Sequence, residues 1–397
     1  MDGRSKHDIE ALIALLGRQF ADAKSPLPPD CRTLFFKNRM EAWYCWLATS
    51  KNEACPVGFQ QAFRSAAERQ ERQRVALRRL CDLLENEEIP FVPIKGVDLA
   101  YRIYPVSALR LFSDWDIWVQ KADLKRFLAL LERDGWRCPS DCRGEHHCGM
   151  RGKDEFRLEP HFTLPNFGRV SPKELWALTR PSPGGNCERH LVGELNLIML
   201  LQHAFCCHAQ WTDPLKLLLD VDFLLKHETV DWQMVSALVR RWHMAHPGLI
   251  LAAFPEFFRG RYESGRVFSS EQCAALRELL LSSKDLTGLF GELKAVSGNP
   301  LSPVWIADRL SRLSRNNLRL KHPKIGRSNV RYLACLAREI THGIGIVCSG
   351  YFRPTEGVRE QSEQEKLIRS SWRDEIPRGH HRCEAAGKAT SQSEKIQ

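Results

Sequence analysis

Two aspartates, Asp114 and Asp116, begin an apolar run that continues to Val119. In a β-strand alternate side chains share a face, so both carboxylates would point the same way. Two carboxylates side by side repel each other, and they become useful when a divalent cation lies between them. The pattern therefore predicts a cation-binding strand over residues 114–119.

The segment before this strand carries groups suited to phosphate. Residues 89–94 are mostly apolar and predict a first strand, which Lys95 and Gly96 end. Lys95 supplies a point charge, and Gly96 permits close backbone approach at the start of a helix predicted over residues 97–104. The alternative for this pair is an ordinary turn between a strand and a helix.

Two further polar residues precede the aspartates. Arg110 has two interpretations: it pairs with phosphate, or it neutralises Asp114. Ser113 stands directly before Asp114.

A second polar face is predicted on a strand at residues 156–164, where apolar and polar residues alternate. Arg157, Glu159 and His161 share the polar face. Pro160 lies between the last two. Because proline cannot donate a hydrogen bond to a neighbouring strand, it predicts an edge position or a bulge.

In this order the motifs resemble the DNA polymerase β-type nucleotidyltransferase superfamily. They resemble more closely a largely uncharacterised bacterial family of nucleotidyltransferases. The resemblance covers about residues 77–232 and rests on Ile94-Lys95-Gly96, then Arg110, then Ser113-Asp114-x-Asp116-Ile117 with Val119. The wider superfamily has Gly-Ser or Gly-Gly where this chain has Lys-Gly.

The resemblance implies a metal-dependent site. Asp114 and Asp116 would hold Mg²⁺ (or Mn²⁺), and Glu159 would be a third ligand or a general base. Two such ions assist in-line attack on the α-phosphate of an NTP. His161 would orient Glu159 or touch substrate, and its alternative is a partner for a nearby backbone group.

The same resemblance assigns residues around the metal. Lys95, Gly96, Arg110 and Ser113 would contact the nucleotide. A later part of the family pattern has a His, a His, an Asp and a Trp, which in this chain fall at His203, His208, Asp220 and Trp232. The first three of these would line the cleft or support the site.

Helical periodicity surrounds the motifs. Helices are predicted over residues 8–22, 34–47, 60–88, 123–134, 172–179, 191–208, 214–227, 231–244, 270–283, 285–296 and 330–349, with a short strand at 136–138 and a loop at 180–186. Asp123 and Gly135 are suited to cap the helix between them. Strand, helix and strand in succession normally give a right-handed parallel pair, which we expect of the strands at 89–94 and 114–119.

One loop gathers cysteine and histidine without matching a strong zinc signature. The residues are Cys138, Cys142, His146, His147 and Cys148. Their spacing differs from that of known structural zinc sites, so we favour a loop without zinc.

Composition indicates an ordinary globular chain with 43% hydrophobic and 27% charged residues, long enough at 397 residues for two domains. Residues 1–10 are polar, which does not fit a signal peptide, and no apolar stretch reaches the roughly 18 residues of a membrane span. The fourteen cysteines lack framework spacing, so we expect reduced thiols in a cytoplasmic protein.

The net charge of +10 is concentrated near residues 301–333. This segment contains one acidic residue, Asp308, and eight basic residues: Arg309, Arg312, Arg315, Arg319, Lys321, Lys324, Arg327 and Arg331. This segment, 309–331, suits an anionic partner such as RNA, a phosphorylated carrier or a membrane surface, and equally suits a solvated helix face. Residues 361–397 are polar, and we expect them to be mostly disordered.

Together these features predict an α+β fold: a small mixed β-sheet nucleotidyltransferase core with N-terminal helices and a C-terminal helical domain. The expected divisions are residues 1–76, 77–170, 171–358 and a tail at 359–397. The predicted function is transfer of a nucleoside monophosphate from an NTP, with ATP-binding expected, to a hydroxyl or phosphate of a small-molecule or carrier acceptor. Alternatives are a non-catalytic nucleotide-binding protein on the same fold and an RNA-modifying transferase.

Overall fold

The computed structural model describes residues 5–137, 150–152, 156–164, 167, 170–206, 213–258, 261–281 and 329–352, with short pieces at 363–364, 367–368 and 370–372. Several predictions fall outside the described residues: those on the loop at 138–148, His208, the helix at 285–296, the basic segment up to residue 328 and most of the tail.

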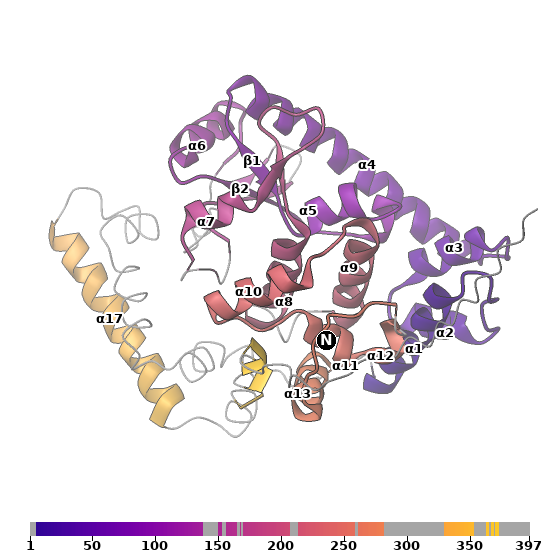
Figure 1. Ribbon diagram of the computed structural model, residues 1–397. Coiled ribbons are helices and arrows are strands. Elements are labelled where there is room, and N and C mark those ends of the chain that lie inside the picture. Colours follow the sequence, from indigo (N-terminus) through magenta and orange to yellow (C-terminus); the bar gives the residue numbers. More distant parts are fainter. Residues whose placement is uncertain are drawn as a thin grey trace, which may run out of the picture.

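A long helix, α4 (Val57–Asn86), delivers the chain to the sheet, as the sequence predicts. At 1.5 Å per residue its 30 residues span about 45 Å. Figure 1 shows it running from α3 (Glu41–Ser50) to the sheet. Near its end Leu77, Leu80 and Leu84 are buried, and each contributes about 1.5–3 kcal/mol by leaving water.

The core is a mixed sheet of four strands in the order β1-β2-β4-β3. The strands are β1 (Phe91–Pro93), β2 (Asp114–Val119), β3 (Met150–Arg151) and β4 (Arg157–His161). β2 pairs with β4 in parallel, and β1 and β3 are antiparallel to their neighbours. This confirms the predicted α+β class with a small mixed sheet.

The predicted parallel pairing of the first two strands is wrong, because β1 and β2 are antiparallel. The connection between them does not cross the sheet. It consists of three short turns, α5 (Gly96–Asp98), η1 (Leu99–Ile103) and η2 (Ser107–Leu109), which contact α4 and the later helix α9 (Pro214–His227). The parallel crossover comes one step later, where α6 (Leu124–Arg133) lies between β2 and β4.

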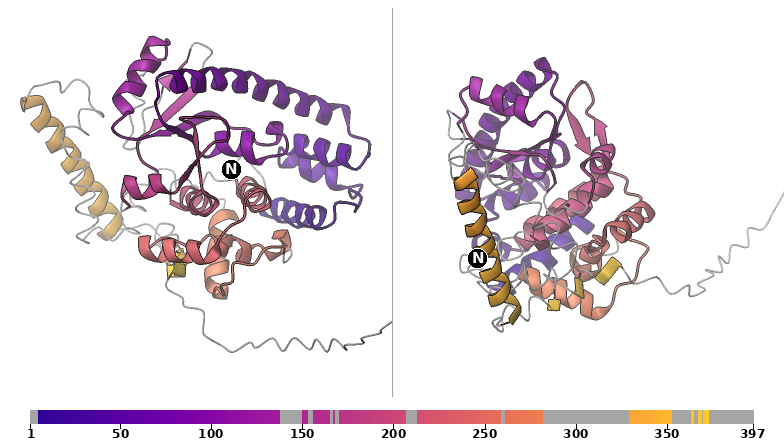
Figure 2. Two further views of the ribbon diagram at one scale, coloured as in Figure 1. Left: turned by 45° about the horizontal axis from the view of Figure 1, so that its top comes forward. Right: turned by 90° about the vertical axis from the view of Figure 1, so that its left-hand side faces the viewer.

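Helices cover both faces of the sheet (Figures 1 and 2). Trp115, Ile117 and Val119 of β2 pack in one hydrophobic cluster with α4 and α6. Trp118 faces the opposite way and packs in another cluster with α8 (Gly193–Cys206) and α10 (Trp232–Trp242). The face that carries Trp118 is also the face of Asp114 and Asp116.

A small hairpin was not predicted from the sequence. β5 (Thr179–Pro181) and β6 (Arg189–Leu191) pair antiparallel around the loop that had been expected at 180–186. Each strand has three residues, too few to show an alternating pattern. The Glu85 carboxylate at the end of α4 accepts hydrogen bonds from the backbone N–H groups of Asn186, Cys187 and Glu188, which fixes the hairpin against α4.

The N-terminal and C-terminal helices share one hydrophobic cluster. It joins α1 (Lys6–Ala21), α2 (Cys31–Lys37) and α3 to α8, α9, α11 (Gly248–Ala253), α12 (Pro255–Phe258) and α13 (Ser270–Leu281). A Cβ on Gly17 would lie 2.1 Å from the Glu256 carbonyl oxygen, so only glycine permits this approach of α1 to α12. The predicted boundary at residue 76 lies within α4.

Part of the tail that we expected to be disordered packs on the helices. Ile368 is fully buried, and Ser370–Trp372 form a 3₁₀ turn. The hydroxyl of Ser371 accepts a hydrogen bond from the backbone N–H of His246 at 3.0 Å. Two further helices, α7 (Pro172–Ala177) and α17 (Asn329–Phe352), agree with the helices predicted at 172–179 and 330–349.

Two broader predictions can be compared with the described part of the chain. None of its helices combines the length and the apolar character needed to cross a membrane. Seven cysteines in it are free thiols: Cys31, Cys45, Cys55, Cys81, Cys187, Cys273 and Cys335.

Candidate active site

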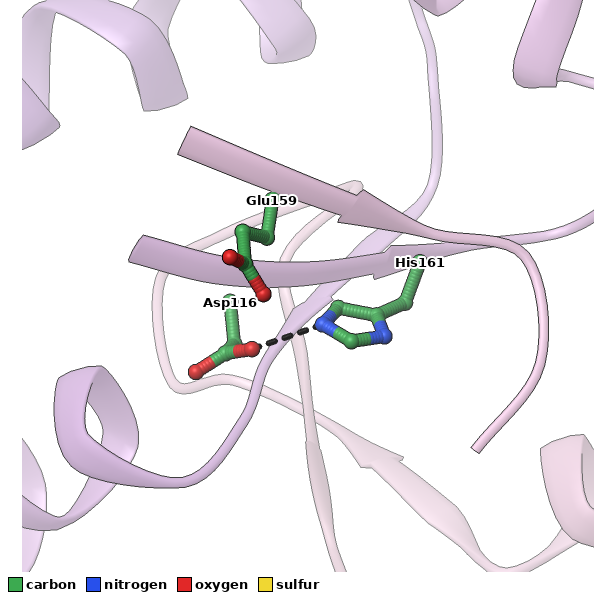
Figure 3. Close-up of side chains that lie close together, drawn as sticks. All are labelled: Asp116, Glu159 and His161. Carbon is green, nitrogen blue, oxygen red and sulfur yellow. Dashed lines mark hydrogen bonds and ion pairs between the residues drawn. The ribbon is translucent and has the colours of Figure 1, made fainter. Parts of the chain in front are cut away.

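The parallel pairing of β2 and β4 brings the two polar faces together. Asp116 lies opposite Glu159 in the register, and Asp114 lies opposite Arg157. Side chains two residues apart on a strand point to the same face, so His161, two residues after Glu159, lies on the same face of the sheet as Glu159 and Asp116. Figure 3 shows Asp116, Glu159 and His161 projecting together from the two strands.

Asp116 is the most enclosed carboxylate of the site, with 4% of the residue exposed. Its Oδ1 lies 2.8 Å from the Lys95 ammonium nitrogen and 2.6 Å from His161 Nε2. Burial alone would raise the pKa of Asp116, but the charge of Lys95 and the hydrogen bond of His161 outweigh it and hold the pKa below its usual range. Asp116 is therefore ionised, and His161 Nε2 carries the hydrogen that it accepts.

Glu159 has a different environment on the neighbouring strand. One of its carboxylate oxygens lies 3.2 Å from the Arg157 guanidinium. Burial, followed by the charges of Asp116 and Asp114, raises the pKa of Glu159 to about 7. A carboxyl with this pKa accepts a proton at neutral pH more readily than an ordinary glutamate does.

The two carboxylates of this site, with His161 beside them, form a group that suits a divalent cation. One ligand atom each from Asp116, Glu159 and His161 lie within 4.8 Å of one another. Ligands on an octahedral ion with bonds of about 2.1 Å are about 3–4 Å apart, so small side-chain adjustments suffice. Carboxylate oxygens are preferred by hard cations such as Mg²⁺.

Asp114 lies at the start of β2, half-buried and outside that close group. Its Oδ1 accepts a hydrogen bond from the Ser113 hydroxyl at 3.1 Å. It is near enough for its charge to raise the pKa of Glu159. The strand therefore presents Asp114 at the solvent side of the site and Asp116 at its buried side.

The turn after β1 positions the Lys95 ammonium beside Asp116. Lys95 has a positive φ of 57°, which is uncommon for a residue other than glycine. A Cβ on Gly96 would lie 2.7 Å from Cβ of Phe112, so glycine allows the turn to pack against the segment before β2. The backbone of Lys95 and Gly96 thus holds the Lys95 ammonium at the site. The helix predicted over residues 97–104 is divided between α5 and η1.

Arg110 pairs with Asp220, a partner that was not among those considered from the sequence. Its Nε and Nη2 donate to the two oxygens of Asp220 at 2.6 and 2.8 Å. The Tyr104 hydroxyl also donates to Asp220, at 2.6 Å. Both charged residues are buried, and the pair links the segment before β2 to α9.

Lys216 was missed in the sequence. It lies on α9, one turn before Asp220, and its side chain is exposed. The surrounding protein, followed by the charge of Arg110, lowers the pKa of Lys216 to about 8, while the charge of Asp114 acts in the opposite direction. Its spacing of four residues from Asp220 was the available signal, since such residues share a helix face.

Two of the remaining predicted residues, His203 and Trp232, belong to the described part of the chain. His203 is half-buried near the end of α8 and is not part of the Asp116–Glu159–His161 group. The ring of Trp232 stacks on that of His246 at a centroid distance of 6.1 Å.

Comparison with known proteins agrees with this geometry. The family model described as uncharacterised nucleotidyltransferase matches residues 44–258, which is more than half of the chain and includes both carboxylate strands. No curated protein and no solved structure matches the chain. The chain belongs to the family of uncharacterised nucleotidyltransferases.

Proposed function

We propose that the protein transfers a nucleoside monophosphate from an NTP to a hydroxyl or phosphate group on a small-molecule or carrier acceptor. The observation that supports this most is the register that sets Glu159 beside Asp116 on the same face as Asp114. Asp114, Asp116 and Glu159 would hold Mg²⁺ or Mn²⁺, and His161 would hold Asp116 in position. A divalent cation bound there would neutralise charge on the triphosphate and favour ionisation of the acceptor.

In the proposed reaction an acceptor oxygen attacks the α-phosphorus of the NTP. The bond from that oxygen to phosphorus forms, the bond from the α-phosphorus to the bridging oxygen breaks, and pyrophosphate leaves. Where Glu159 is not itself a ligand of the cation, it would take the proton of an acceptor hydroxyl, which its raised pKa suits. Lys95, which follows β1, and Lys216, which lies on α9, provide positive charge for the phosphates.

The test is pyrophosphate release with each of the four NTPs and Mg²⁺ or Mn²⁺, using a cell extract as the acceptor source. Wild type, Asp116→Asn and Glu159→Gln are compared with Asp123→Asn, which removes an acid that pairs with Arg126 on α6. We expect release to require extract, cation, Asp116 and Glu159, and to be indifferent to Asp123. The active NTP then identifies the donor. Release that persists in Asp116→Asn would contradict the proposal.

A non-catalytic nucleotide-binding protein is the second candidate. It is favoured by the ion pair of Lys95 with Asp116, because an ammonium already balances the most buried carboxylate. This candidate predicts saturable NTP binding without pyrophosphate release from any extract. The location proposed from the sequence, the cytoplasm, is tested separately by cell fractionation.

A further inference from the structure

The Lys95 ammonium lies against Asp116, one of the three carboxylates proposed to hold the cation. Its nitrogen is 2.8 Å from Asp116 Oδ1, and only 13% of the Lys95 side chain is exposed. Burial lowers the pKa of Lys95, but the charges of Asp116, Glu159 and Asp114 together raise it above its ordinary value. The ammonium thus has the surroundings expected of a bound cation.

The Lys95 backbone is held on both sides. The backbone N–H of Ile94 donates to the Asp116 carbonyl at 3.0 Å, and that of Leu99 donates to the Lys95 carbonyl at 3.0 Å. With φ of 57° and ψ of −127°, Lys95 occupies a conformation found mainly in glycine. The fixed backbone directs the side chain at Asp116, and only its flexible four-carbon stem needs to move for the ammonium to leave.

A divalent cation and this ammonium compete for the same carboxylates, because two positive charges at such short range repel each other. We propose that the Lys95 ammonium occupies the cation position in the metal-free protein and moves from Asp116 to a phosphate of the nucleotide when the cation binds. This inference rests on the proposed function, since it assumes that a divalent cation and a triphosphate share the site.

The exchange couples the two ligands. Cation binding releases Lys95 from Asp116 and makes its charge available to the triphosphate. Nucleotide binding draws Lys95 away and opens Asp116 to the cation. Coupling of this kind is reciprocal, so each ligand increases the affinity for the other by the same factor. Lys95 is in this account a positioning residue that favours joint binding of cation and nucleotide.

Calorimetric titration with Mn²⁺, without nucleotide, tests the exchange. Lys95→Gln removes the competing charge but keeps a polar side chain, so we expect Mn²⁺ to bind at least about tenfold more tightly than to wild type. A non-hydrolysable NTP analogue should increase Mn²⁺ affinity in wild type more than in Lys95→Gln. Lys226→Gln is the matched control, because Lys226 pairs with Asp222 at 2.6 Å outside the site and should leave Mn²⁺ affinity unchanged.

Unchanged or weaker Mn²⁺ binding by Lys95→Gln, with clear binding by wild type, would overturn the exchange and leave the proposed function intact. Wild type that binds no Mn²⁺, with or without the analogue, would remove the proposed function as well.

A second measurement on wild type does not depend on the folding of a variant. The rate of Lys95 acetylation, followed by mass spectrometry, should rise with Mn²⁺ alone and fall again when the analogue is added. A rate that Mn²⁺ does not change would overturn the inference.

Discussion

Arg110 and Asp220 form a buried bidentate ion pair between the segment that precedes β2 and helix α9, with distances of 2.6 and 2.8 Å. The Tyr104 hydroxyl donates to the same carboxylate. Asp114 follows Arg110 by four residues, and Lys216 precedes Asp220 by four. The ion pair therefore sets the start of β2 against the helix that carries Lys216.

Removal of the guanidinium should destabilise the protein strongly. Arg110→Met leaves the Asp220 carboxylate buried without its counter-charge, and breaking such a pair from one side costs about 3–5 kcal/mol. Urea unfolding measures the free energy of unfolding. The control is Arg79→Met, whose partner Asp134 lies 2.7 Å away but whose own side chain is 70% exposed, so it should change stability little. Equal losses in the two variants would contradict a special role for the buried pair.

Glu85 should stabilise the β5–β6 hairpin through its three backbone contacts. Burial opposes the charged form, but the backbone hydrogen bonds of Glu188, Cys187 and Asn186 lower the pKa of Glu85 overall. Glu85→Ala leaves those N–H groups without the carboxylate and should reduce the free energy of unfolding by about 1–3 kcal/mol. Hydrogen exchange at residues 186–188 should accelerate in this variant. Glu87→Ala, which removes an exposed partner of Arg133, should not affect that exchange.

Stability should decrease in mild acid because His246 is buried as the neutral imidazole. Its Nδ1 accepts from the backbone N–H of Gly248 at 3.1 Å, so Nε2 carries the hydrogen and donates to the Ser236 hydroxyl. Burial, followed by the charge of Arg266, lowers the pKa of His246 to about 3. The unfolded chain takes up this proton near pH 6.5 and the folded chain does not, so stability falls as pH decreases from about 6.5 towards 3.

The His246 contribution has a defined size and a direct measurement. One proton of difference gives a slope of up to about 1.4 kcal/mol per pH unit in the free energy of unfolding. Unfolding in urea at several pH values between 4.5 and 7.5 gives this slope. His246→Asn keeps a side-chain oxygen as acceptor and has no titrating ring, so its slope should be smaller by that amount. An identical slope in wild type and variant would show that His246 is protonated in the folded state.

The sequence predicts elements best where local signals agree. The bounds of β2 and α9 match their predicted ranges, 114–119 and 214–227. For α9, Pro214 stands at the first turn and the Asp213 side chain accepts from the Leu215 N–H, so the start is determined locally. The direction of β1 relative to β2 was mispredicted because the helix between them is broken into short turns that do not cross the sheet.

The site was predictable in its strands but not in its long-range partners. Alternation on each strand selected the faces of Asp116 and Glu159, and the β2–β4 register then places them side by side. Arg110 and Asp220 are 110 residues apart, and no local periodicity links positions at that distance. Lys216 shares a helix face with Asp220, but which elements that face of α9 meets depends on how the helix packs, which its own pattern does not show.

Lys216 should contribute to nucleotide affinity rather than to cation affinity. The surrounding protein and the charge of Arg110 lower the pKa of Lys216 to about 8, and a phosphate would supply an opposite charge beside its ammonium. We expect Lys216→Met to raise KM for the NTP about tenfold with kcat reduced less, as expected for loss of one phosphate contact. Lys125→Met on α6, beyond the opposite face of the sheet, is the control. A fall in kcat alone would place Lys216 in the chemical step instead.

His161 should support cation binding by positioning Asp116, without being a ligand itself. The ionised Asp116 oxygen accepts its Nε2 hydrogen at 2.6 Å, so that nitrogen has no lone pair for a cation in this arrangement. Loss of such a supporting group typically costs about 10–100-fold in metal affinity. We expect His161→Ala to weaken Mg²⁺ and Mn²⁺ binding by similar factors in calorimetric titration, with His161→Gln restoring part of the loss through its amide hydrogen. A loss confined to Mn²⁺ would place the imidazole among the ligands, because a nitrogen donor favours Mn²⁺ over Mg²⁺.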